Sequence, residues 1–258
     1  MAEYEIGRRG DDDLAGKVAL VTGAGRNIGR AIALALANGG ASIAVNARTS
    51  LDDAEETVAQ IEETGAEAQV IVADVSDIDD VERLIEATVE RFGRLDILVN
   101  NAAVRHETPL LEMSFSEWRA VFAATLDSTF LCTKAVLPHM IAAGGGAIVN
   151  IGGQTAHGVV TERAHVVAAK AGVAAFTKAV ALEFAPHNVT VNCVVPGAID
   201  TVRGLPGAPE RPVSRKVPPI GRRGSVWEIA TMVRLLAGPE GRYITGQTIH
   251  VNGGGYMP

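Results

Sequence analysis

The amino-acid sequence predicts a single α/β domain built on a doubly wound parallel sheet. Short apolar segments that suit buried strands alternate with longer amphipathic segments that suit helices, and no repeat or low-complexity linker interrupts them. The first apolar segment runs into a glycine-rich turn that a helix should follow. With 258 residues, 47% hydrophobic but only 4% aromatic, the chain can bury one large core of small aliphatic side chains. Strands separated by helices imply parallel pairing with right-handed crossovers.

The apolar and amphipathic segments predict the elements in chain order. Strands are expected at 17–22, 41–46, 68–72 and 97–99. Helices are expected from Ile28 onward, at 52–64 before Gly65, and at 78–92 before Gly93. In the second half we expect one long helix at 115–140, a strand at 147–151, a helix at 171–185, a strand at 188–197 and a last strand within 244–254.

The composition argues against several classes of function. The formal net charge of −7 gives no electrostatic basis for binding nucleic acid. The two cysteines, Cys132 and Cys193, make no disulfide framework, so a cytoplasmic protein is expected. No apolar run approaches the roughly 20 residues of a membrane helix, and residues 1–13 lack the apolar stretch of a signal peptide. We therefore expect no membrane partner, a flexible extension over 1–13 and one domain over 14–258.

The glycine-rich turn is the first candidate binding site. It reads Thr-Gly-Ala-Gly-Arg-Asn-Ile-Gly from Thr22 to Gly29. Small residues let the backbone approach a pyrophosphate, and the helix N-terminus supplies N–H groups and a positive dipole end. Asparagine enters left-handed conformations more readily than other side chains, so Asn27 can stand in for a glycine. By itself the turn could be an ordinary strand–helix connection; as a dinucleotide site it uses Gly23, Gly25, Arg26, Asn27 and Ile28.

Further motifs resemble those of the short-chain dehydrogenase/reductase family. The turn is similar to the family's Thr-Gly-x-x-x-Gly-x-Gly, and Asn100-Asn101-Ala102-Ala103 to its Asn-Asn-Ala-Gly signature. The resemblance covers about residues 14–256 and implies a Rossmann-type fold, a nicotinamide cofactor and a 3-oxoacyl-carrier-protein-reductase-like branch. It adds to the cofactor residues the Asp-Val pair beside the adenine, the signature itself and the turn beside the nicotinamide: Asp74, Val75, Asn101, Ala102, Pro196, Gly197, Ile199 and Thr201.

The end of the second strand indicates which nicotinamide cofactor is bound. The acidic residue that binds the ribose diol of NAD would fall at Ala47 and is absent. Arg48 stands next to that position and Arg26 lies in the glycine-rich turn, and two guanidinium groups can grip a 2′-phosphate bidentately. This pattern favours NADP. NAD remains possible, because both arginines could simply be solvated.

Residues 150–172 resemble the family's active-site segment but depart from it. Lys170 matches the catalytic lysine, which in relatives also binds the nicotinamide ribose. The positions four residues before it and thirteen before that hold Val166 and Gly153, where the family has Tyr and Ser. Neither can transfer a proton or polarise a carbonyl. The family's Asn, which kinks its helix and holds a water on the lysine, falls at Thr125. A threonine can bond its own preceding turn, so a bend is still expected.

Other polar side chains in this segment are candidates for the missing chemistry. Gln154 follows the strand, and Arg163 lies two helical turns before Lys170, where the enoyl reductase branch carries its Tyr. An arginine can bind an oxyanion but cannot donate its proton at neutral pH. His165 has a suitable pKa for an acid but sits about 140° from Lys170 on the helix, so it could face a subunit interface instead. Each of these, like His106, could also be an ordinary loop or interface side chain.

Residues 202–223 are the expected substrate lid. They contain one acid, Glu210, against six basic residues, namely Arg203, Arg211, Arg215, Lys216, Arg222 and Arg223. In an acidic chain this excess suggests an anionic or carrier-linked substrate, although a solvated lid would look the same.

The sequence therefore predicts an NADP-dependent oxidoreductase acting on a carbonyl, enone or imine, or on the corresponding alcohol. Two other classes remain open: a cofactor-binding regulator or partner subunit without redox activity, and a non-redox lyase, isomerase or hydratase. The helix after Lys170 and the last strand resemble the family's subunit contacts, which implies a homotetramer. No metal site is expected.

Overall fold

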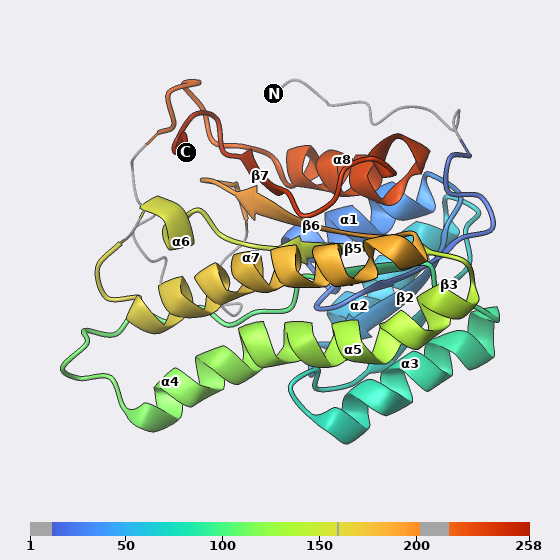
Figure 1. The fold of residues 1–258 in the computed structure, drawn as a ribbon, viewed down its shortest axis with the longest axis horizontal. Helices are drawn as coiled ribbons and strands as arrows, with labels where there is room; N and C mark the ends of the chain where they lie inside the picture. The colour runs from blue at the N-terminus through green and yellow to red at the C-terminus, as the bar shows by residue number, and fades with distance from the viewer. Residues whose placement is uncertain (1–11, 159, 202–216) are drawn as a thin grey trace.

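A seven-stranded sheet forms the centre of the molecule in the computed structural model, which describes residues 12–158, 160–201 and 217–258 (Figure 1). Its order is β3-β2-β1-β4-β5-β6-β7, and every neighbouring pair is parallel. The strands are β1 (Val18–Val21), β2 (Ser42–Ala47), β3 (Ala68–Val72), β4 (Ile97–Asn100), β5 (Gly146–Ile151), β6 (Val189–Pro196) and β7 (Thr248–Val251). The strand order reverses between β1 and β4, which confirms the predicted doubly wound, single-domain α/β fold and places a ligand crevice at that point.

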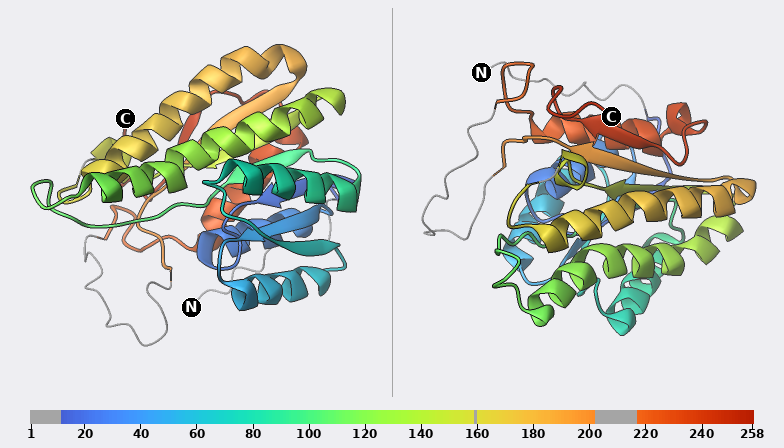
Figure 2. Two further views of the ribbon diagram at one scale, coloured as in Figure 1. Left: turned by 90° about the horizontal axis from the view of Figure 1, so that it is seen from below. Right: turned by 60° about the vertical axis from the view of Figure 1, so that its left-hand side comes forward.

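Helices cover both faces of the sheet, as Figures 1 and 2 show. One face carries α1 (Asn27–Ala37), α2 (Leu51–Glu62) and α8 (Val226–Ala237). The other carries α3 (Ile78–Phe92), α5 (Ser128–Ala142) and α7 (Ala164–Phe184), with α4 (Phe115–Phe122) leading into α5. Each face has its own aliphatic core, since strand side chains point alternately to opposite faces. The short elements are α6 (Thr155–Gly158), η2 (Ala185–His187) and η3 (Pro239–Gly241).

Several predicted elements differ from those observed. The single helix expected at 115–140 is interrupted by a π-helical turn, η1 (Ala123–Asp127). Helix α7 begins at Ala164, seven residues before the predicted start, and the last strand is confined to Thr248–Val251. Helix α8 was not predicted, although Ser225 and Glu228 form a reciprocal capping box at its start, a pattern that the sequence carries.

Two further expectations need correction. Asp13 accepts a hydrogen bond from Arg234 Nη2 at 2.6 Å, and Leu14 is buried, so Asp13 belongs to the domain and not to the extension. Residues 1–11 of the extension lie outside the described residues. Two helical stretches, Phe115–Ala142 and Ala164–His187, are long and apolar enough to cross a membrane by length and composition alone. Of the most apolar 18-residue window in each, 44% and 50% is buried within the protein, as expected of helices that cover a core sheet.

Candidate active site

The glycine-rich turn has the close backbone packing that a pyrophosphate site requires. Gly23 has φ of 61°, and a Cβ there would lie 3.1 Å from the Cα of Ala102. A Cβ at Gly29 would lie 2.6 Å from the Asn101 amide nitrogen, so neither position can take a side chain without movement. Asn27 has φ of 53°, the left-handed conformation that its replacement of a glycine requires. Small residues thus let the backbone pack closely at the start of α1, where a phosphate would bind.

Thr22 and Asn101 hold this turn against the next strand of the sheet. Thr22 Oγ1 accepts hydrogen bonds from the backbone N–H groups of Asn101 and Ala102, both at 3.0 Å. The Asn101 amide donates to the carbonyls of Thr22 and Gly23, both at 2.9 Å. The sequence motif identified Asn101 and Ala102 but gave no separate role to Thr22. Its role depends on β1 and β4 being neighbours, although the two strands are far apart in the chain.

The ends of β2 and β3 carry the residues that the sequence predicts beside an adenine. Arg48 follows β2, and its side chain forms an ion pair with Asp74, with Nη1 3.6 Å from Oδ2. Arg26 is exposed at the N-cap of α1, and Val75 is buried. The structure therefore places both predicted arginines after the carboxyl ends of β1 and β2, and it shows that Arg48 already has an acidic partner.

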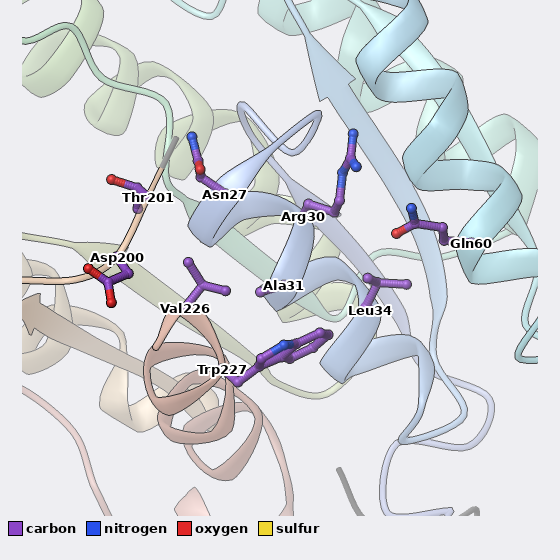
Figure 3. Close-up of a pocket in the computed structure, with 9 residues that line it drawn as sticks. All are labelled: Asn27, Arg30, Ala31, Leu34, Gln60, Asp200, Thr201, Val226 and Trp227. Atoms are coloured by element: carbon purple, nitrogen blue, oxygen red, sulfur yellow. The ribbon is translucent and has the colours of Figure 1, made fainter. Parts of the chain in front are cut away.

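An open groove of about 500 Å³ borders this crevice where α1, α2 and α8 meet (Figure 3). Asn27 and Thr201 lie at one end and Trp227 lies beneath Leu34; the lining residues are Asn27, Arg30, Ala31, Leu34, Gln60, Asp200, Thr201, Val226 and Trp227. Arg30 donates to Gly25 O at 2.6 Å and to Thr57 Oγ1 at 3.0 Å, so it braces the glycine-rich turn. The groove thus joins the phosphate end of the crevice.

The residues that the sequence predicts beside a nicotinamide lie where β5, β6 and β7 finish. Gln154 N donates to Pro196 O at 3.2 Å, and Gln154 Nε2 donates to Gly255 O at 2.9 Å. A Cβ on Gly197 would lie 2.6 Å from the Cα of Asn252, so glycine is required there. Ile199 is buried, and Thr201 lies near Asn27. Gln154 therefore holds the C-terminal segment against the site.

Lys170 is a buried charged group at the carboxyl end of β5. It is only 9% exposed, and its Nζ donates to the carbonyl of Ile151 at 2.5 Å. Burial lowers the pKa of Lys170 to about 8, an effect that Cys193 partly opposes. Among residues 12–158, 160–201 and 217–258, no carboxylate lies within ion-pair distance of it. The side chain can therefore exchange a proton near neutral pH, which an ordinary exposed lysine does not do.

Neither Gly153 nor Val166 has a side chain that could donate a proton in place of Lys170. A Cβ on Gly153 would meet only Thr155 Oγ1 at 3.6 Å and Lys170 Cγ at 3.7 Å, so the space beside the lysine is open. Val166 packs with Val121, Phe122 and Ala169 in a small apolar cluster. The buried Lys170 side chain thus lies beside Gly153 and one helical turn after Val166, next to the crevice of the sheet.

Comparisons with known proteins fit this geometry. The family model described as enoyl-(acyl carrier protein) reductase matches residues 23–256. A 3-oxoacyl-[acyl-carrier-protein] reductase of Synechocystis is 43% identical over 247 residues, covering 95% of this chain and 98% of the relative. The chain belongs to the short-chain dehydrogenase/reductase family. Its identity to the Synechocystis reductase, and 41% identity to one of Staphylococcus aureus over 93% of this chain and 98% of that one, place it in the 3-oxoacyl-carrier-protein-reductase-like branch of these oxidoreductases.

Solved structures support the same assignment. A dehydrogenase/reductase from Sinorhizobium meliloti has a TM-score of 0.90 and 35% identity, covering 96% of this chain and 98% of that one. An acetoin dehydrogenase from Salmonella typhimurium has a TM-score of 0.84 and 36% identity, covering 93% and 96%. The Rossmann-type fold predicted for this short-chain dehydrogenase/reductase is therefore confirmed over nearly its whole length.

Thr125 lies in the π-helical turn of this family member, so the helix is irregular where a bend was expected. The cause is not the expected one: the Thr125 hydroxyl does not bond its preceding turn. Its Oγ1 is buried and has no hydrogen-bond partner among the residues that the structure describes. A buried hydroxyl of this kind normally has a partner, so a water or a ligand group is expected beside it.

Arg163 and His165 both lie against acidic side chains of the segment that follows β4. Arg163 caps α7 instead of lying within it and forms an ion pair with Glu107. The side chain of His165 is fully buried, with Nε2 3.5 Å from Glu117 Oε1 on α4, so it lies inside the subunit and not at its surface. Both side chains fasten the start of α7 to the segment that follows β4. The helical-face reasoning for Arg163 failed because the helix begins one residue after it.

The C-terminal segment brings a phenol to the rim of the site. Tyr256 is distant from the active-site segment in sequence, but its ring lies 5.6 Å from that of His157 on α6 and 5.1 Å from that of His250 on β7. Burial and the neighbouring His157 lower the pKa of His250. These contacts were not predicted, because they depend on β7 lying beside β6.

Proposed function

We propose that this protein is an NADP-dependent reductase of a carbonyl, enone or imine in which Lys170 itself supplies the proton. The observation that carries the proposal is the buried Lys170 side chain, whose Nζ contacts Ile151 O and whose Cγ lies 3.7 Å from the place of a Cβ on Gly153. The glycine-rich turn and the Pro196–Gly197 turn, which we assign to a dinucleotide, follow strands of the same sheet. We assign Val166 and Gly153 to the positions where relatives hold their catalytic Tyr and Ser, which makes the active site atypical.

The residues present fit a nicotinamide cofactor. Gly23 and Gly29 leave backbone where side chains would collide, and Asn27 adopts the conformation of a glycine. Thr22, Asn101 and Pro196–Gly197 would hold the two ends. Bound NADPH would supply a hydride. The chain's own contribution is to hold a proton at Lys170 Nζ and to fix that atom against Ile151 O.

The relatives' name suggests a carrier-linked 3-oxoacyl group as the substrate class. The described part of the basic lid gives this less support than the sequence did. Arg222 bonds Glu228 at 2.7 Å and holds the pKa of that carboxyl at about 2, while Arg223 pairs with Asp200. Arg203, Arg211, Arg215 and Lys216 lie outside the described residues. We keep an anionic or carrier-linked substrate and a cytoplasmic location as parts of the proposal.

The proposal is tested by following NADPH oxidation with a panel of ketones, enones and imines, including a 3-oxoacyl thioester, beside a cofactor titration. Turnover of any of these classes supports it. Cofactor binding without turnover of any of them contradicts it, and would favour a regulatory or partner-subunit role.

NADPH is expected to bind more tightly than NADH, by about 10-fold, because Arg48 and Arg26 can contact a 2′-phosphate through charge-assisted hydrogen bonds. Arg48→Ala should remove most of this difference by weakening NADPH and leaving NADH unchanged. Isothermal titration calorimetry with both cofactors checks it. Equal affinities in the wild type would contradict the assignment to NADP.

A homotetramer is the expected assembly. The outer faces of the α5 and α7 region carry exposed apolar side chains, among them Phe130 and Leu182, which an isolated subunit would leave in water. Light scattering coupled to size-exclusion chromatography at micromolar concentration measures the mass. A monomer would rule this assembly out, and Leu182→Glu should shift the equilibrium towards smaller species.

A further inference from the structure

The ion pair between Arg48 and Asp74 joins two residues assigned separately to the cofactor site. Arg48 Nη1 lies 3.6 Å from Asp74 Oδ2, at the carboxyl ends of β2 and β3. The arginine side chain is 60% exposed, whereas that of Asp74 is 37% exposed. An exposed arginine at a strand end has many accessible rotamers, so its contact with a fixed partner restricts where the guanidinium lies.

Asp74 is well suited to be that fixed partner. Its Oδ1 accepts hydrogen bonds from Ser76 N at 3.0 Å and from Ser76 Oγ at 2.6 Å. Its backbone N–H donates to Asp80 Oδ2 at 2.7 Å. Burial raises the pKa of Asp74, but the Ser76 hydrogen bonds and the charge of Arg48 outweigh it, so the net pKa is lowered. The carboxylate is therefore charged at neutral pH and held by its neighbours, with Oδ2 directed to Arg48.

Resting on the proposed NADP preference, we propose that Asp74 is a positioning residue that selects NADP(H) by holding Arg48 where the 2′-phosphate binds. The guanidinium has five N–H donors, so a contact through Nη1 leaves others for a phosphate. Pre-ordering the side chain removes part of the entropy that phosphate binding would otherwise cost. The negative charge of Asp74 opposes the phosphate, but the guanidinium neutralises it and solvent screens it at this exposed edge.

The test separates the phosphate from the rest of the nucleotide by using adenosine 2′,5′-bisphosphate and adenosine 5′-monophosphate as calorimetric probes. Asp74→Asn keeps an oxygen that can accept from Ser76 but removes the charge that holds Arg48. We expect the bisphosphate to bind about three- to tenfold more weakly and the monophosphate to bind unchanged. An equal loss for both probes would show that Asp74 acts on the adenosine alone, and tighter binding of the bisphosphate would show that it repels the phosphate; either overturns the inference.

Three further variants make the result specific. Asp79→Asn removes a charge from the first turn of α3, at an exposed residue, and should change neither affinity. Ser76→Ala removes one of the two Ser76 hydrogen bonds that hold the Asp74 carboxylate, and it should weaken bisphosphate binding by a smaller factor. This variant keeps the inference testable if Asp74→Asn fails to fold. In an Arg48→Ala background, Asp74→Asn should have no further effect on the bisphosphate; a full additional loss would overturn the inference.

The measurements distinguish a failure of the proposed NADP preference from a failure of the proposed role of Asp74. Wild-type protein that binds both probes equally well contradicts that preference and the inference with it. Wild-type protein that prefers the bisphosphate, with Asp74→Asn unchanged, overturns the role of Asp74 alone.

Discussion

Replacing Lys170 with methionine is expected to lower NADPH-dependent reduction by about 10²–10⁴-fold, the usual contribution of a positioned acid. Methionine keeps the length and apolar stem of the side chain but cannot hold a proton. Cofactor affinity should fall much less, because the glycine-rich turn and Asn101 lie elsewhere in the crevice. The measurements are kcat/KM with the preferred substrate and a separate NADPH titration.

The same role predicts a pH dependence with a defined sign. Because burial lowers the pKa of Lys170 to about 8, the group carries its proton below that pH and loses it above. Reduction needs the protonated form, so kcat/KM should be flat below pH 8 and fall about tenfold per pH unit above it. This limb should be absent from the residual activity of Lys170→Met.

His165→Ala is the matched control for this experiment. His165 is buried against Glu117 and faces α4, so its loss should reduce stability and leave the chemical step intact. Activity lost in His165→Ala but kept in Lys170→Met would transfer the acid role to the histidine. Activity indifferent to both would mean that the substrate or a water supplies the proton.

Restoring the family's side chains is the second large expected effect. Gly153→Ser combined with Val166→Tyr should raise the reduction of simple 3-oxoacyl esters by about 10²–10⁴-fold, because a hydroxyl acid is then placed one helical turn before Lys170. The serine fits directly, since nothing lies closer than 3.6 Å to its Cβ. The tyrosine must turn away from Val121 and Phe122, which pack on Val166, and enter the open space beside Lys170.

The control for size is Gly153→Ser with Val166→Phe, which adds a ring of similar volume without the hydroxyl. A gain with tyrosine but not with phenylalanine assigns the effect to proton transfer. Equal rates in the two double variants, or a wild type that already reduces these esters quickly, would contradict the assignment of Val166 to the tyrosine position. Adding Thr125→Asn should increase the gain if the unpartnered site at Thr125 holds a water.

Local sequence patterns specified most of the framework. The ranges predicted for β3 and α3 match the structure, because apolar periodicity and a closing Gly93 are local signals. The left-handed conformation of Asn27 follows from its place in the turn. The position of Lys170 beside Gly153 could also be anticipated, because a strand, a turn and a helix that follow one another fix the spacing. The family and the cofactor crevice were therefore predictable from the chain itself.

The tertiary structure alone decided what the polar side chains of the site contact. Arg163 pairs with Glu107, Arg48 with Asp74, and Tyr256 packs on His157, in each case with a partner from a distant segment. A sequence pattern sets the spacing of side chains along one element. It does not set which other element arrives beside them, because that depends on strand order, on where a helix begins and on how loops fold back. Local patterns therefore specified most of the fold, whereas the partners of these polar side chains were fixed only when distant segments met.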